Sequence, residues 1–286
     1  MTRVRAVGIV GAGWLGGALA RVLSPPVVAT TRSGRWPHGD PPPGAELHAL
    51  ALCAPRLELG PLGEASALVI SIAPGRSQDR RALYVDGTRR LLETRTSTGH
   101  PLRRVVFVGS TSALPDVDGW VDESCEIWPQ HERGRVQREA EAVVQACCEA
   151  AEVPWLVLRM GGLYGPGREL ARIYASDAPR RRGLGPDGAL PGHGAEPTNL
   201  IHRDDAVAAL QAALRLPAEI GGVVHVVDDD HTPRREMYAR IATARGLEPV
   251  RWAEPPPPDG ERTGKKVRND ALKQVLGVRL SHPTHS

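Results

Sequence analysis

The stretch Val7-Gly8-Ile9-Val10-Gly11-Ala12-Gly13-Trp14-Leu15-Gly16-Gly17 decides the fold of this 286-residue chain. A short apolar run, typical of a buried strand, ends in three spaced glycines, and a helix-compatible segment follows them. In such a strand–turn–helix unit Gly11 permits the turn, Gly13 lets backbone approach a pyrophosphate, and Gly16 lets the helix pack on the strand. The spacing therefore predicts a dinucleotide site, with a glycine turn that binds nothing as the alternative.

The helix that follows this turn begins at Trp14 and Leu15. The first N–H groups of a helix have no partner within it, and the helix dipole places partial positive charge at that end. Both effects favour bound phosphate. We therefore expect the backbone of Trp14 and Leu15 to contact the cofactor.

The second predicted strand, residues 27–31, ends where the two nicotinamide dinucleotides are distinguished. In dinucleotide folds an acidic residue about 20 positions after the first glycine holds the ribose 2′-hydroxyl, but the chain carries Thr31-Arg32-Ser33 here. The Arg32 guanidinium suits a 2′-phosphate, and Thr31 and Ser33 add hydroxyl donors. A solvated arginine in a surface turn is the alternative. We expect NADP(H) rather than NAD(H).

The composition argues against several classes of partner. The net charge is +3, and the one dense basic run, Arg180–Arg182, lacks the aromatic side chains of a nucleic-acid surface. No apolar run approaches the roughly 20 residues that span a bilayer, and no signal-peptide pattern follows Met1. The four cysteines lack metal or redox spacing. We expect a cytoplasmic protein that binds a small molecule and no metal, nucleic acid or membrane.

Apolar runs alternate with helical segments over the first 160 residues. The runs at 67–73, 104–109 and 155–159 are typical of strands buried in a parallel sheet. This alternation predicts a doubly wound parallel α/β sheet of the Rossmann type. Residues 116–129 are expected to form a loop.

The division into domains follows from where this alternation stops. We expect residues 1–160 to form an NADP-binding domain, completed by a helix and a last strand within 199–228. Residues 161–198 and 229–286 are expected to form a smaller C-terminal lobe that binds the substrate, because their Gly-, Pro- and Arg-rich texture is typical of segments that line a site.

The ends of two predicted strands carry candidate site residues. Ile72 and Ala73 end the run at 67–73 and would lie beside the cofactor, and Ser110 and Ser112 end the run at 104–109. The carboxyl ends of parallel strands are where α/β sheets build their sites. Turn formation alone is the alternative for the serines.

Several motifs together carry a resemblance to a known family. They are the glycine turn and the stretches 84–93, 106–112, 121–123, 158–168, 199–205 and 264–269. In these stretches the chain resembles extended short-chain dehydrogenases/reductases of the NAD(P)-dependent epimerase/dehydratase type, and its last stretch is similar to one divergent branch. The resemblance implies that Ser110 holds the active-site Ser/Thr position and that Gly161 lies near the nicotinamide. It also implies a possible homodimer through the predicted helices at 81–94 and 135–150.

The chain departs from this family at the catalytic Tyr-x-x-x-Lys pair, where it has Arg133 and Gln137. In the family the tyrosine moves the substrate proton, and the lysine lowers the pKa of that tyrosine and holds the nicotinamide ribose. Arginine stays protonated and cannot act as a base, although Arg133 could bind an anionic group or stabilise oxyanion charge. Gln137 could still form a hydrogen bond with the ribose.

Other side chains could supply the proton. Tyr84 stands where the family usually has asparagine, on a helix that passes the active-site serine, with a tyrosine packed on the sheet as the alternative. His131 and Glu132 precede the helix at 135–150, where surface positions are the alternative. Tyr164 lies in the loop near the nicotinamide, where packing explains it equally well.

We therefore expect an NAD(P)(H)-dependent oxidoreductase or epimerase that acts on a small carbonyl, hydroxyl or imine substrate with a non-standard proton donor. A non-catalytic NADP(H)-binding regulatory or scaffold protein is one alternative. A redox-neutral isomerase or cyclase on the same fold is another. The arginines of 168–182 suit an anionic substrate group or are simply solvated.

Overall fold

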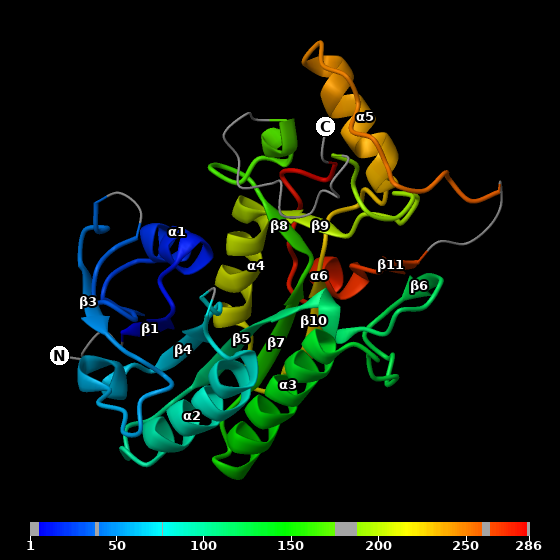
Figure 1. The fold of residues 1–286 in the computed structure, drawn as a ribbon. Helices are drawn as coiled ribbons and strands as arrows, with labels where there is room; N and C mark the ends of the chain where they lie inside the picture. Colours follow the sequence, from blue (N-terminus) through cyan, green and yellow to red (C-terminus); the bar gives the residue numbers. More distant parts are fainter. Residues whose placement is uncertain (1–5, 38–39, 76, 175–187, 259–263, 285–286) are drawn as a thin grey trace.

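A seven-stranded sheet forms the centre of the protein in a computed structural model that describes residues 6–37, 40–75, 77–174, 188–258 and 264–284. The strand order is β10-β7-β5-β4-β1-β2-β3, and every neighbouring pair is parallel (Figure 1). The strands are β1 (Val7–Val10), β2 (Val27–Thr31), β3 (Ala45–Ala49), β4 (Ala67–Ile70), β5 (Arg104–Ser110), β7 (Trp155–Met160) and β10 (Gly222–Val226). This order confirms the doubly wound Rossmann-type sheet.

Helices cover both faces of the sheet. One face carries α1 (Trp14–Val22) and α4 (Arg203–Arg215), whose apolar side chains share a core with β1 and β7. The other face carries α2 (Thr88–Thr96) and α3 (Glu132–Ala150), which lie side by side in Figure 1. Because both faces are buried, the strands are almost continuously apolar. Among the described residues, no helix is long and apolar enough to span a bilayer.

A π-helix, η2 (Ala82–Gly87), leads directly into α2. Sequence reasoning expects one continuous α-helix over 81–94, so this segment differs from the expectation. A π-helix closes its hydrogen bonds over five residues instead of four, which changes the direction in which its side chains point. Such wide turns occur frequently at functional sites.

Shorter elements surround the carboxyl end of the sheet. The pairs β8 (Gly162–Tyr164) with β9 (Leu200–His202) and β6 (Gly119–Val121) with β11 (Lys265–Val267) are both parallel. The remaining elements are η1 (Gly60–Glu64), η3 (Thr111–Ala113), η4 (Leu170–Tyr174), α5 (Arg234–Ala244) and α6 (Asp270–Gln274). Helix α5 projects from the body of the molecule at the top of Figure 1.

One expectation about this region needs correction. Residues 116–129 are not all loop, because β6 pairs with β11 across 146 positions of the chain. In the segment around α6, Leu272, Leu276 and Val278 are buried in the same core as α1 and α4. Strands of three residues carry no periodicity by which a sequence could reveal them.

Candidate active site

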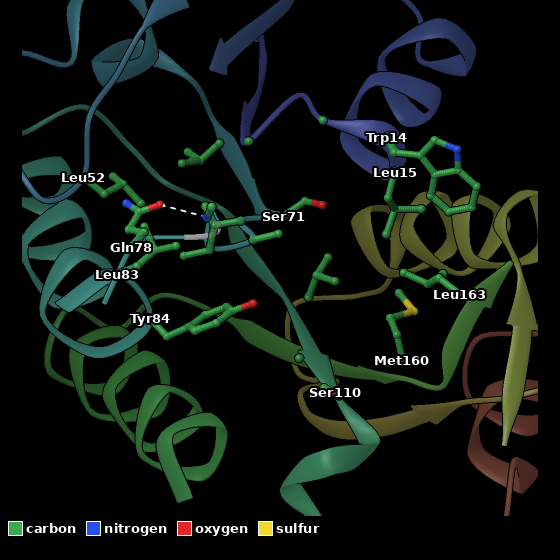
Figure 2. Close-up of a pocket in the computed structure, with 18 of the residues that line it drawn as sticks. Trp14, Leu15, Leu52, Ser71, Gln78, Leu83, Tyr84, Ser110, Met160 and Leu163 are labelled. Carbon is green, nitrogen blue, oxygen red and sulfur yellow. Dashed lines mark hydrogen bonds between the residues drawn. The ribbon is translucent and has the colours of Figure 1, made fainter. Parts of the chain in front are cut away.

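A cavity of about 1040 Å³ opens where β1, β2, β4, β5 and β7 end. In doubly wound sheets this edge is the usual ligand site. Gly16, Glu132 and Tyr164 do not line it, whereas these other residues nominated by the sequence do: Gly11, Gly13, Trp14, Leu15, Thr31, Arg32, Ser33, Ile72, Ala73, Tyr84, Ser110, Ser112, His131, Arg133, Gln137 and Gly161. Figure 2 shows Trp14 and Leu15 on one side of the cavity and Tyr84 on the other.

The three glycines of the first turn have separate structural roles. Gly11 has a φ of 93°, and a Cβ there would lie 2.3 Å from the Ser71 carbonyl oxygen. A Cβ on Gly16 would lie 2.3 Å from the Gly11 carbonyl oxygen, so Gly16 serves helix packing and lies outside the cavity. A Cβ on Gly13 would meet nothing within 4 Å. Helix α1 has no side-chain cap, and the open space beside its first N–H groups fits a pyrophosphate.

The end of β2 presents cationic and hydroxyl groups to the cavity. Arg32, Ser33 and Arg35 all line it, and the Arg32 guanidinium reaches to within 3.7 Å of where a Cβ on Gly75 would lie. The Thr31 hydroxyl, in contrast, donates to the Arg35 carbonyl at 3.1 Å and accepts the Arg35 N–H at 3.2 Å. Its one proton is committed to the turn, so Thr31 is not the extra donor that the sequence suggests.

Two serines at the end of β5 form a directed hydrogen-bond pair. Ser110 accepts from the Ser112 hydroxyl at 3.0 Å and from the Ser112 backbone N–H at 3.2 Å. A hydroxyl has one proton and two lone pairs, so these contacts occupy the lone pairs of Ser110 and leave its proton available. Ser110 can therefore donate a hydrogen bond to an oxygen or nitrogen in the cavity, with Ser112 fixing its orientation.

Tyr84 comes from η2, and Figure 2 shows its hydroxyl directed into the cavity. The ring belongs to the core beneath the sheet and the residue is 8% exposed, so it packs and also lines the cavity. Burial raises the pKa of the phenol, while the hydrogen bond with the Gln137 side chain and the charges of Arg80 and Arg133 act in the opposite direction. The phenol is consequently protonated at neutral pH and can act as a proton donor.

The start of α3 brings the two substituted family positions into the cavity. Gln137 is buried, whereas Arg133 is exposed and makes no ion pair with any residue that the structure describes. A Cβ on Gly134 would lie 2.4 Å from the Ser112 carbonyl oxygen, so glycine permits α3 to begin directly against the serine turn. Arg133 therefore presents an uncompensated positive charge close to the end of β5.

His131 caps α3 and does not face the cavity as a free base. Its Nδ1 accepts the Gly134 N–H at 2.9 Å, which places the proton of the neutral ring on Nε2, 3.9 Å from Asp116. Glu132 is exposed, pairs with Arg135 at 3.4 Å and is absent from the cavity wall. Of these two sequence candidates, only His131 lines the cavity.

Tyr164 lies outside the cavity wall. Its ring packs edge-on against His202 with 5.2 Å between centroids, and burial raises the pKa of its hydroxyl. Packing thus accounts for this residue. Among the other sequence candidates, Arg180–Arg182 lie outside the described residues.

Two further cations line the cavity, Lys265, which the sequence does not nominate, and Arg168, which it names only as one of the arginines of 168–182. Lys265 of β11 lines the cavity, with its Nζ bound to the carbonyls of Leu114 and Pro115 at 3.2 and 3.0 Å. Arg168 reaches the cavity from the loop after β8. Both belong to stretches that resemble the family, 158–168 and 264–269, but only the folded chain shows that they meet the glycine turn and the serine turn.

A buried ion pair lies behind the site. Arg159 of β7 donates to Glu141 of α3 from Nε at 3.0 Å and from Nη2 at 2.8 Å, in a bidentate arrangement. His225 of β10 lies 3.4 Å from Arg159 Nη1. Burial and the Arg159 charge lower the pKa of His225 to about 3, so the ring is neutral and can accept from the guanidinium. This network joins α3 to the sheet.

Comparison with known proteins places this geometry in a family. The sequence profile of the NAD dependent epimerase/dehydratase family matches residues 9–227. Protein YeeZ of Escherichia coli strain K12 is 30% identical over 297 residues, covering 98% of this chain and 97% of its own. A 3-diazoavenalumate denitrifying reductase of a Streptomyces species is 30% identical, covering 71% of this chain and 68% of its own.

Solved structures show the same fold. MoeE5 in complex with UDP-glucuronic acid and NAD superposes with a TM-score of 0.76 at 24% identity, covering 96% of this chain and 93% of its own. The profile match covers more than half of the chain. The matched range includes the glycine turn and the serine at the end of β5. The chain belongs to the NAD dependent epimerase/dehydratase family, the extended short-chain dehydrogenases/reductases.

Proposed function

We propose that the chain is an NADP(H)-dependent reductase of a small carbonyl or imine compound, with Tyr84 as the proton donor. One observation carries this proposal: the protonated phenol of Tyr84 lines the cavity that Ser110 and the glycine turn also line. A reductase needs a site for the dinucleotide, a hydrogen-bond donor for the substrate and a proton donor, and the described residues supply a candidate for each.

The residues of the cavity fit the cofactor. The uncapped start of α1 and the open space at Gly13 suit the pyrophosphate, and Gln137 is available to the nicotinamide ribose. Arg32 and Ser33 at the end of β2 favour a 2′-phosphate, and no acidic residue follows Thr31 to hold a free 2′-hydroxyl. The bound dinucleotide supplies a hydride, and the protein positions and polarises the substrate.

The protonation state of Tyr84 favours reduction over oxidation. Hydride addition to a carbonyl or imine leaves negative charge on the oxygen or nitrogen, and that atom must receive a proton. Because burial keeps the Tyr84 phenol protonated, the residue is ready to donate, whereas oxidation would first require the phenolate. Ser110 would orient the reacting atom, and the free positive charge of Arg133 would stabilise developing negative charge. The relative named a denitrifying reductase is consistent with this direction.

A substrate screen with paired variants tests the proposal. Aldehydes, ketones and imines are added to the protein with NADPH, and loss of reduced nicotinamide absorbance is followed. Tyr84→Phe should lower kcat by about 10²–10⁴-fold with NADPH affinity retained. The matched control is Tyr238→Phe, because Tyr238 stacks on Trp252 away from the cavity. Full turnover by Tyr84→Phe would assign the proton to another group, and no turnover with any compound would favour a non-catalytic dinucleotide-binding protein.

A further inference from the structure

The loop after β8 is fixed to the first residue of α1. The Trp14 indole N–H donates to the Pro166 carbonyl at 2.9 Å, and the Arg168 guanidinium lies 4.5 Å from the centre of the Trp14 ring. These contacts join segments about 150 residues apart. A guanidinium over an indole is a favourable cation–π arrangement, and stacking fixes the plane of the guanidinium.

The turn that carries Arg168 is itself well defined. Arg168 donates its N–H to the Gly165 carbonyl at 2.7 Å, and Gly165 donates to the Arg168 carbonyl at 3.3 Å. The Glu169 carboxylate accepts the Gly167 N–H at 2.7 Å. Gly165 and Gly167 have φ values of 135° and 77°, which only glycine adopts readily. Arg168 is therefore held against Trp14 before any ligand arrives.

The positive charge of Arg168 has no acidic partner among the described residues. Its neighbour Glu169 accepts a backbone N–H, and burial, together with the nearby Arg172 charge, lowers the pKa of Arg168. The other guanidinium near the indole, that of Arg203, is neutralised by Asp204 at 3.2 Å. Arg168 is thus an uncompensated cation in the wall of the cavity, beside Gly13 and Trp14.

We propose that Arg168 binds the pyrophosphate of the dinucleotide, which the N–H groups at the start of α1 contact as well. A planar guanidinium can contact phosphate oxygens in a bidentate manner, and the open space at Gly13 leaves room for them. Trp14 supports the guanidinium from behind through its ring. The loop of the smaller lobe thereby holds the cofactor onto the Rossmann sheet. This inference rests on the dinucleotide-binding part of the proposed function.

Ligand fragments separate this contact from the one at Arg32. Isothermal titration calorimetry is performed with NADPH, with ADP-ribose, which has the pyrophosphate but no 2′-phosphate, and with 2′-AMP, which has only the latter. Arg168→Gln should weaken the binding of NADPH and of ADP-ribose by about 10–100-fold and should change the affinity for 2′-AMP by less than about twofold. Arg32→Gln should weaken the binding of NADPH and of 2′-AMP and should leave the affinity for ADP-ribose unchanged. Arg240→Gln, an exposed change on α5, should alter none of them.

A second variant tests the role of the indole. Trp14→Leu keeps the backbone N–H but removes the ring on which the Arg168 guanidinium stacks. It should therefore weaken the binding of ADP-ribose, but by less than Arg168→Gln does. Unchanged ADP-ribose affinity in Arg168→Gln would overturn the proposal and leave Arg168 to a substrate anion. Equal losses for all three ligands would also overturn it, because they would indicate general damage to the cavity. Failure of the wild-type protein to bind any of the three would overturn the proposed function as well.

Discussion

Arg133 and Tyr84 line the same cavity although they come from different helices, and the charge of Arg133 opposes the rise that burial causes in the pKa of Tyr84. In the family motif that α3 resembles, a tyrosine stands at position 133 and a lysine at position 137. Here position 133 supplies the positive charge and η2 supplies the phenol. A tyrosine and a cation are still present together, but both occupy new positions in the chain.

This relationship predicts the pH dependence of reduction. The rate should be constant while Tyr84 is protonated and should fall as pH rises through its pKa, which lies above the ordinary value of about 10. Removing the Arg133 charge in Arg133→Leu should raise that pKa further and move the alkaline fall to higher pH. Steady-state kcat measured against pH tests this, with Arg135→Leu as the control outside the cavity wall. An unmoved alkaline limb in Arg133→Leu would contradict the pairing.

The hydrogen bonds between Ser110 and Ser112 predict unequal effects of their substitution. Ser110→Ala removes the donor to the substrate, and kcat should fall by about 10²–10³-fold. Ser112→Ala keeps the Ser112 backbone N–H, which also orients Ser110, so kcat should fall by less than about tenfold. Ser110→Thr retains a hydroxyl and should recover part of the activity. Equal losses for the two alanine variants would argue that Ser112 contacts the substrate itself.

Arg32 predicts the preference between the two cofactors. Arg32→Ala should weaken the binding of NADPH by about 10–100-fold, because charged hydrogen bonds to the 2′-phosphate are lost. The affinity for NADH should be nearly unchanged. Fluorescence titration with each reduced dinucleotide measures both affinities. Tighter binding of NADH than of NADPH by the wild-type protein would show that Arg32 does not act on a 2′-phosphate.

The buried ring of His225 predicts a loss of stability in acid. Its pKa is about 3 in the folded protein and about 6.5 in an unfolded chain. Between these values the unfolded state binds a proton that the folded state does not, so stability falls with decreasing pH by about 1.4 kcal/mol per unit. The variant His225→Gln has no histidine to protonate on unfolding. The difference in free energy of unfolding between wild type and variant should therefore shrink as pH falls below about 6. Denaturant unfolding at several pH values provides the measurement, and a difference independent of pH would contradict the assignment.

Local signals in the sequence were sufficient for the doubly wound parallel sheet, and they singled out residues of the glycine turn and of the end of β2 that line the cavity. The spacing from Gly11 to Gly16 is typical of a strand–turn–helix unit, and long apolar runs such as that of β5 indicate buried parallel strands. Lys265 and Arg168 could not be placed in this way. Their position depends on β11 pairing with β6 and on a loop that stacks on Trp14, and both contacts join distant parts of the chain.

Tyr84 shows a different limit of sequence reasoning. An α-helical periodicity over 81–94 leaves a packed ring and a cavity-facing phenol as competing interpretations. The structure has a π-helix there, and the ring packs in the core while its hydroxyl faces the cavity. No residue in 82–87 indicates a π-helix in the sequence, so only the tertiary structure could decide between these two interpretations of Tyr84.

The pairing of β6 with β11 forms a small sheet that we expect to open independently of the central sheet. Each strand has only three residues, and the pair lies apart from the seven-stranded sheet. Amide protons of such a small sheet should exchange with solvent far sooner than those of β1 or β4, which are buried on both faces. Because Lys265 belongs to this pair, we expect the cavity wall at Lys265 to exchange its amide protons with solvent sooner than the wall that the end of β1 forms.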